Sequence, residues 1–233
     1  MKYIKKKTEP KTLKAKRKTV GSRYECAQED WQKQLLDEQG YLCAYCMKPI
    51  SLDRDKNGKP RIEIEHYLSR KQHPNLSLQW KNMLGVCNGI SGINPHCDKA
   101  KGKENDQGFF IKGKIHGDSN LRFLNPLNRR NSEKIVKYSL TGEILPNTTN
   151  QNFNREISEE LNCVLNLNDD KLKRNRKGAM DDAKDLLKRK YPTGKWKITD
   201  IDKEIRDWQS RTKDGRYKAY CQAAIWYLEQ LKK

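Results

Sequence analysis

Four cysteines in two pairs provide the strongest chemical signal in this chain. Two residues separate Cys43 from Cys46, whereas nine residues separate Cys87 from Cys97. Four thiolates can hold Zn²⁺ in a closed tetrahedral site. Two pairs with a strand-sized segment between them indicate a metal more strongly than one Cys-x-x-Cys does. The pattern predicts a structural zinc site on these cysteines, with His96 as an alternative ligand in place of Cys97.

A second group of polar residues lies between the cysteine pairs and directly after them. His66 titrates near neutral pH and could take a proton from a water molecule that attacks phosphorus. Asp98 follows Cys97 at the start of a predicted helix, where a carboxylate binds Mg²⁺ or Mn²⁺ or caps the helix. Asn82 would orient the imidazole or the loop around it. Glu65 is a second candidate metal ligand, although strand alternation points it away from the histidine.

Basic residues suggest the substrate of such a site. The chain has 49 Lys and Arg against 30 Asp and Glu, a net charge of +19. Such a field attracts polyanions, and nucleic acid is the obvious one. We expect the lysines that follow Asp98 to contact the substrate backbone: Lys99, Lys101 and Lys103. The alternative is a solvated basic surface of the kind that ribosomal and chromatin proteins carry.

The elements that must position these residues follow from local patterns. Apolar spacing predicts a helix over 29–39 that stops at Gly40 and leads into the first cysteine pair. Alternation predicts a strand over 61–66, with a second strand over 82–87. A short helix should begin at Asp98 and continue to about residue 103. Strand, loop, strand and short helix form the ββα arrangement of a compact metal-bound nuclease core.

The second half of the chain has a different pattern. Segments 123–126 and 135–145 predict a hairpin that turns at Thr141 and Gly142. Beyond residue 150 the sequence predicts helices, in segments 157–165, 179–190, 199–211, where Thr199 would be the cap, and 217–231. The fold class is therefore α+β, a ββα-metal core stapled by four cysteines and followed by a mainly helical C-terminal region. We expect a nuclease core over 26–120 and a hairpin plus helical region over 121–233.

The first 25 residues are expected to form a separate basic arm. The first twenty contain eight lysines and one arginine against a single acidic residue, Glu9. Alone in water such a segment should be disordered. It would then lie on phosphate or on an acidic protein face, or act only as a solubilising tail.

The sequence also bears on location. The longest apolar run, 223–228, is far shorter than the roughly twenty residues needed to span a membrane, and the N-terminus lacks the apolar segment of a secretory signal. Seven cysteines in a pattern that suits metal better than disulfides indicate a reducing, cytoplasmic compartment. The remaining cysteines are expected to be buried free thiols: Cys26, Cys163 and Cys221.

Together these motifs resemble a known family. Glu65-His66, Asn82 and Cys97-Asp98 with Lys101-Gly102, between cysteine pairs, resemble HNH endonucleases with a ββα-metal fold. Segments 64–67, 73–82 and 96–98 are similar to the PtuB subgroup found in Septu and retron anti-phage systems. Similar C-terminal segments, 123–126, 142–144, 165–168 and 174–176, extend the resemblance over most of the chain. The final histidine of the HNH pattern is here Asp98, a better ligand for a hard metal.

The resemblance implies a function and partners. His66 would be the general base, Asn82 the middle residue and Asp98 the metal ligand of an antiviral effector that hydrolyses phosphodiester bonds. Members of the subgroup work beside a PtuA-type ABC ATPase, and in retrons beside a reverse transcriptase and its multicopy single-stranded DNA. The substrate could be DNA or RNA, for example a tRNA. The competing hypothesis is a non-catalytic zinc module that docks nucleic acid or assembles the complex.

Overall fold

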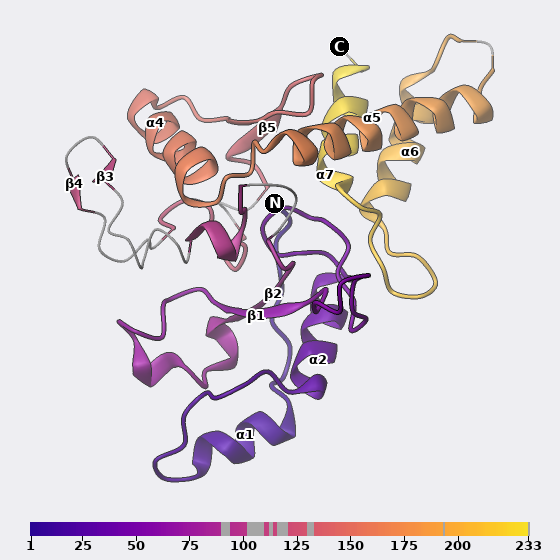
Figure 1. The fold of residues 1–233 in the computed structure, drawn as a ribbon. Helices are drawn as coiled ribbons and strands as arrows, with labels where there is room; N and C mark the ends of the chain where they lie inside the picture. Colours follow the sequence, from indigo (N-terminus) through magenta and orange to yellow (C-terminus); the bar gives the residue numbers. More distant parts are fainter. Residues whose placement is uncertain are drawn as a thin grey trace.

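The computed structural model describes residues 1–89, 94–101, 110–111, 114–115, 121–129, 133–192 and 194–232. The fold is α+β, with two-stranded antiparallel sheets and a mainly helical C-terminal region. Helices α1 and α2 and the β1–β2 hairpin lie in one half of the molecule, and α4 to α7 with β5–β6 lie in the other (Figure 1). The N-terminus lies between the two halves.

The element bounds are as follows. The α-helices are α1 Lys11–Lys18, α2 Glu29–Gln39, α4 Gln151–Glu159, α5 Asp170–Lys190, α6 Ile198–Gln209 and α7 Cys221–Gln230. The strands are β1 Glu63–His66, β2 Met83–Val86, β3 Phe110–Ile111, β4 Lys114–Ile115, β5 Val136–Tyr138 and β6 Ile144–Pro146. Short 3₁₀ turns occupy Pro74–Leu76 and Trp80–Asn82, a π-helical turn follows α4 at Glu160–Val164, and residues 98–101 form a helical turn.

Helix α2 has the predicted bounds and the predicted stop. Its residues Trp31, Leu35 and Leu36 are buried in the core. Gly40 has φ +60°, and a Cβ at this position would lie 2.3 Å from a ring carbon of Tyr217. The Tyr217 N–H donates to the Gly40 carbonyl at 3.0 Å. Glycine is therefore required both by the left-handed conformation and by the close approach of the C-terminal region.

The β1–β2 hairpin is shorter than the two predicted strands. Its antiparallel register pairs Glu63 with Val86 and His66 with Met83, and Asn82 belongs to the 3₁₀ turn that precedes β2. The buried amide of Gln39 fixes the hairpin to α2, because it both donates to the Gly85 carbonyl and accepts from the Gly85 N–H, each at 2.7 Å.

Helix starts in the C-terminal half differ from the predicted ones. Helix α5 begins at Asp170, well before the predicted residue 179, because the Asp169 carboxylate caps it by accepting from two backbone N–H groups. Lys197, not Thr199, is the cap of α6. Helix α7 begins at Cys221, after Tyr220 takes a left-handed conformation with φ 52°. The Tyr220 N–H donates to the carbonyl of Met47, so a tertiary contact accompanies this start.

Strands β5 and β6 form the predicted hairpin, which turns at Gly142 with φ +82°. Segment 123–126 lies outside it and has no regular structure. Instead, the Glu160 carboxylate accepts the backbone N–H groups of residues 122–124. The hairpin is held against α5 by Arg176, whose Nε donates to the Gly142 carbonyl at 2.5 Å.

The expectation that the first residues are disordered is wrong. Met1, Ile4 and Leu13 are fully or almost fully buried in the core. The Ile4 N–H donates to the Pro126 carbonyl at 2.8 Å. Composition alone suggested a solvated arm, but three apolar side chains spaced along the segment are enough to anchor it. The division at residues 25 and 120 stays a prediction.

Cysteines outside the paired set have different surroundings. Cys221 is buried, as expected, whereas Cys26 and Cys163 are exposed. In the described part of the chain no helix combines the length and apolarity that crossing a membrane requires.

Candidate functional site

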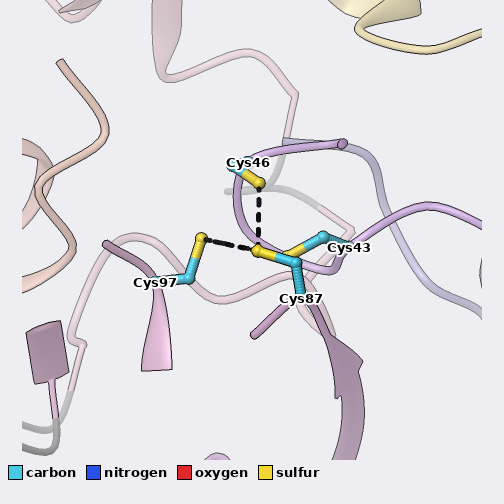
Figure 2. Close-up of side chains that lie close together, drawn as sticks. All are labelled: Cys43, Cys46, Cys87 and Cys97. Carbon is cyan, nitrogen blue, oxygen red and sulfur yellow. Dashed lines mark hydrogen bonds between the residues drawn. The ribbon is translucent and has the colours of Figure 1, made fainter. Parts of the chain in front are cut away.

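The two cysteine pairs meet in one buried cluster. The Sγ atoms of Cys43, Cys46, Cys87 and Cys97 all lie within 4.8 Å of one another. Cys46 Sγ is 3.8 Å from Cys87 Sγ, which is 4.0 Å from Cys97 Sγ (Figure 2). Four sulfurs bound to one zinc ion at about 2.3 Å in a tetrahedron would lie roughly 3.8 Å apart. The donor set and its spacing thus fit a structural zinc ion.

Three parts of the chain bring these sulfurs together. Cys43 and Cys46 lie in a tight turn after α2, closed by the Cys43 N–H donating to the Lys48 carbonyl at 2.9 Å. Cys87 directly follows β2. Cys97 has φ 57°, and its N–H donates to the carbonyl of Leu165 at 2.8 Å. A hydrogen bond to the C-terminal region therefore fixes the position of Cys97, the last of the four cysteines in the sequence.

The electrostatics of the cluster favour a bound cation. Burial raises the pKa of the Cys46 and Cys97 thiols well above the usual value. Hydrogen bonds from neighbouring thiols, that of Cys43 first, lower the pKa of Cys87 well below it. The thiolate of Cys87 is thus stabilised while Cys46 and Cys97 resist ionisation, and a bound divalent cation would stabilise the thiolate ligands. His96 lies beside the cluster, with Nδ1 3.1 Å from Cys97 Sγ.

A buried carboxylate, Glu65 of β1, and a half-buried one, Asp98, form a second cluster. Asp98 is hydrogen-bonded to Glu65, and burial, followed by the negative charge of Glu65, raises the pKa of Asp98 well above its usual range. The Tyr45 hydroxyl donates to Glu65 Oε1 at 3.1 Å. Lys101 Nζ donates to the same oxygen at 2.5 Å and to the Tyr67 carbonyl at 2.8 Å. Paired carboxylate oxygens of this kind are suitable ligands for a hard divalent cation.

The three lysines after Asp98 have different positions. Lys101 is only 3% exposed and pairs with Glu65, so its ammonium is not offered to a phosphate, contrary to our expectation. Lys99 is exposed and pairs with Glu63 at 2.8 Å. Lys103 lies outside the described residues. Helical phase explains the burial of Lys101, since a residue three positions after Asp98 shares its face of the helical turn.

His66 lies at the end of β1 and is 6% exposed. Its Nε2 is 2.8 Å from the Ser77 carbonyl oxygen, and the Tyr24 ring packs edge-on at 4.6 Å between centroids. Burial lowers the pKa of His66 to about 4, with the Ser77 hydrogen bond opposing the shift and the Arg70 charge adding to it. The imidazole is therefore neutral at pH 7.

Asn82 holds the loop that follows β1 and does not bond the imidazole. Its side-chain oxygen accepts the Leu68 N–H at 2.8 Å, and its Nδ2 donates to the carbonyls of Leu68 and Leu76. Ser77, the partner of His66, lies directly after this segment. Of the two roles considered for Asn82, the structure supports the one that orients the loop.

The two parts of the site lie on opposite faces of one strand. The register of β1 is regular through Glu65 and His66, without a bulge, so their side chains point to opposite faces. The charges of Asp98 and Lys101 nevertheless affect the titration of His66. The candidate base therefore feels the charge of Asp98 across the strand, although no hydrogen bond joins the two side chains within the described residues.

Sequence reasoning missed three residues that shape this site. Tyr45 lies inside the Cys-x-x-Cys segment, and its signal was an aromatic residue between two metal ligands. Tyr24 lies in a segment with no local motif, and Ser77 contacts His66 through its backbone carbonyl, which no residue type signals; only the tertiary fold brings the two to His66.

Comparison with known proteins gives one informative relative. No family model matches the chain. The chain is 29% identical over 130 residues to an Escherichia coli protein named "Retron Ec83 putative HNH endonuclease". The alignment covers 50% of this chain and 47% of that protein, so the chain spans about half the length of the curated relative. The similarity shows that this chain is a distant homologue of that retron protein.

Proposed function

We propose that this protein is a metal-dependent endonuclease of the HNH type that hydrolyses phosphodiester bonds in nucleic acid. The observation that carries the proposal is a neutral buried histidine, His66, next to Glu65 on strand β1, with Asp98 hydrogen-bonded to Glu65 from the helical turn that directly follows the four-cysteine cluster. The distant homology to a retron protein named as an HNH endonuclease supports the same conclusion.

Glu65 and Asp98 would hold the catalytic Mg²⁺ or Mn²⁺. Two carboxylates in hydrogen-bond contact, with the pKa of Asp98 raised by burial and by Glu65, form a site that favours added positive charge. A divalent cation there would supply Lewis-acid stabilisation of the phosphate and of the leaving 3′ oxygen. Tyr45 and Lys101 hold the Glu65 carboxylate in place through Oε1.

His66 would act as the general base. The Ser77 carbonyl can only accept a hydrogen bond, so Nε2 of the imidazole carries the hydrogen. Nδ1 is then left with the lone pair, and it makes no hydrogen bond within the described residues. This nitrogen can take a proton from the attacking water, and Ser77 keeps the ring oriented as the positive charge forms.

The cysteine cluster would act as a structural support for this chemistry. Cys97 immediately precedes Asp98, and Cys43 and Cys46 flank Tyr45. A zinc ion on these thiolates would fix both the metal ligand and the residue that orients Glu65, without taking part in catalysis.

The biological setting is proposed from the resemblance and the retron relative. The protein would be an effector of an anti-phage system related to PtuB. Its partners would be a PtuA-type ABC ATPase and, in a retron, a reverse transcriptase with its multicopy single-stranded DNA. The substrate would be DNA or RNA.

A second function, a non-catalytic nucleic-acid-binding or scaffold subunit, is favoured by one observation. His66 is almost fully covered, with Tyr24 against its ring. A base must reach water at the scissile phosphate, so Tyr24 would have to move for catalysis. A scaffold would need no such movement.

Cleavage assays on separate pools test the proposal. The purified protein, alone and with its genomic neighbours, is incubated with DNA or with total RNA in Mg²⁺ or Mn²⁺. Wild type should degrade one pool, and Asp98→Asn and Glu65→Gln should each lower the rate by at least about a hundredfold. Undiminished cleavage by both variants would remove the carboxylate pair from the mechanism, and no cleavage by wild type in any combination would favour the scaffold.

A further inference from the structure

Helix α1 presents positive charge without interleaved acids. Five of its eight residues are Lys or Arg, and none is acidic. Leu13 is buried and anchors the helix. Three lysines are exposed and make no ion pair or side-chain hydrogen bond within the described residues: Lys11, Lys14 and Lys18. Their ammonium groups are therefore free to meet an anion.

Contacts between aromatic rings connect α1 to His66. Trp31 Nε1 donates to Thr12 Oγ1 of α1 at 2.8 Å, and the Trp31 ring lies 6.2 Å from that of Tyr24. Tyr24 in turn packs on His66, and the Arg70 guanidinium lies 4.7 Å from the Tyr24 ring centroid. Trp31 is fully buried, so these contacts link the basic helix to the candidate base through packed side chains, and the exposed Arg70 lies over the same Tyr24 ring.

The basic residues of the longest helix, α5, differ from those of α1. Helix α5 interleaves four acidic residues with its nine Lys and Arg, and three lysines pair within the helix: Lys173–Asp170, Lys177–Asp181 and Lys188–Asp185. It also lies at the opposite end of the molecule from α1 (Figure 1). In α1, Lys16 and Arg17 pair with Glu25 and Glu9, whereas Lys11, Lys14 and Lys18 carry charge with no ion-pair partner within the described residues.

We propose that the exposed face of α1, continued by the exposed Arg70 and Lys71 of the loop after β1, binds the phosphodiester backbone and leads it to His66. This inference rests on the proposed nuclease function and assigns its substrate-binding surface. Free ammonium groups along a helix match successive phosphates, and such contacts position a nucleic acid without reading its sequence. Lys101 is buried and cannot contact the substrate backbone, so this surface would provide the phosphate contacts that the sequence assigned to that lysine.

Binding measurements with matched variants test the surface. The test protein carries Lys11→Gln, Lys14→Gln and Lys18→Gln, and the control carries Lys177→Gln, Lys184→Gln and Lys188→Gln on α5. Each set removes three charges and substitutes a residue of similar helix propensity. Both are made in a His66→Ala chain, so cleavage does not enter the measurement. Fluorescence anisotropy then gives the affinity for labelled single-stranded DNA, duplex DNA and RNA of equal length across a salt series.

The α1 set should weaken binding at least about tenfold at 150 mM salt and lower the slope of log affinity against log salt by about two to three. The α5 set should change affinity by less than about threefold. The polymer that loses most affinity identifies the substrate class. Equal weakening by the two sets would show a diffuse field and overturn the proposal, as would unchanged affinity of the α1 set for all three polymers. If the α1 set weakens binding as expected but the chain with His66 intact cleaves none of these polymers in Mg²⁺ or Mn²⁺, alone or with its genomic neighbours, the nuclease proposal alone is overturned.

Discussion

At the residue scale, the candidate site uses two neighbours on one strand for different tasks. Glu65 faces Tyr45, Asp98 and Lys101, whereas His66 faces Ser77 and Tyr24. Residue types and spacing were enough to predict the cysteine cluster, whereas the roles of His66, Glu65 and Asp98 stay predictions. They could not show that Lys101 is buried, because burial of a lysine depends on which carboxylate the fold places against it.

The lowered pKa of His66 predicts acid sensitivity. In the unfolded chain a histidine has a pKa near 6.5, so between pH 6.5 and about 4 the unfolded state binds more protons than the folded state. The free energy of unfolding should therefore fall as pH drops through this window, by up to about 3 kcal/mol from this residue. Urea denaturation at pH 7, 5 and 4 should show a steeper loss for wild type than for His66→Gln. Parallel pH profiles of the two proteins would contradict the buried neutral histidine.

At the element scale, the segments with strong local signals were predicted well. Helix α2 and its glycine stop agree with the sequence pattern, and the β1–β2 hairpin differs only at its ends. The start of α7 was predicted too early because its position accompanies a contact between Tyr220 and Met47 that no local pattern contains. The N-terminal segment was predicted to be disordered because its composition is dominated by basic residues. Its few apolar residues nevertheless determine the packing, because they are buried in the core.

Deleting residues 1–9 should destabilise the whole protein. The deletion removes two buried side chains, Met1 and Ile4, each worth about 1.5–3 kcal/mol. It also removes Lys6, whose Nζ lies 2.8 Å from the buried Glu38 carboxylate and over the Trp80 ring. A buried carboxylate that loses its cationic partner costs a further several kcal/mol. Thermal unfolding should show a large fall in Tm or no cooperative transition.

The matched control for this deletion is Lys5→Gln with Lys7→Gln, which removes two exposed charges and keeps the packing. Its Tm should stay within a few degrees of wild type. A truncated chain that unfolds at the wild-type temperature would restore the interpretation of these residues as an independent arm.

At the scale of the whole molecule, the cysteine cluster lies where the two halves meet. The Cys97 N–H donates a hydrogen bond to the Leu165 carbonyl, and the Asn166 side-chain amide donates to the Pro95 carbonyl at 2.9 Å. The distribution of charge also belongs to this scale: three exposed lysines of α1 have no ion-pair partner within the described residues, whereas three lysines of α5 pair with acidic residues of the same helix. Net charge predicted a polyanionic partner, but only the fold shows which surface carries the free charge.

Cys46→Ser should release zinc and lower the stability of both halves together. Wild type should contain about one zinc ion per chain by mass spectrometry, and the variant much less. Its Tm should fall in a single transition, because the C-terminal region shares the ligand segment. Cys163→Ser, which alters an exposed thiol outside the cluster, is the control and should keep its zinc. Equal metal content in the two variants would contradict the zinc site.

The measurement that tests the central claim most directly is the single-turnover rate of phosphodiester cleavage by wild type and His66→Ala. The two proteins should be matched for zinc content and supplied with Mg²⁺ and the activating partners. His73→Ala, which changes a histidine on the adjoining loop, serves as the control. The account predicts cleavage by wild type and His73→Ala and a loss of at least about a hundredfold in His66→Ala. Equal rates in all three proteins would contradict the assignment of His66 as the general base.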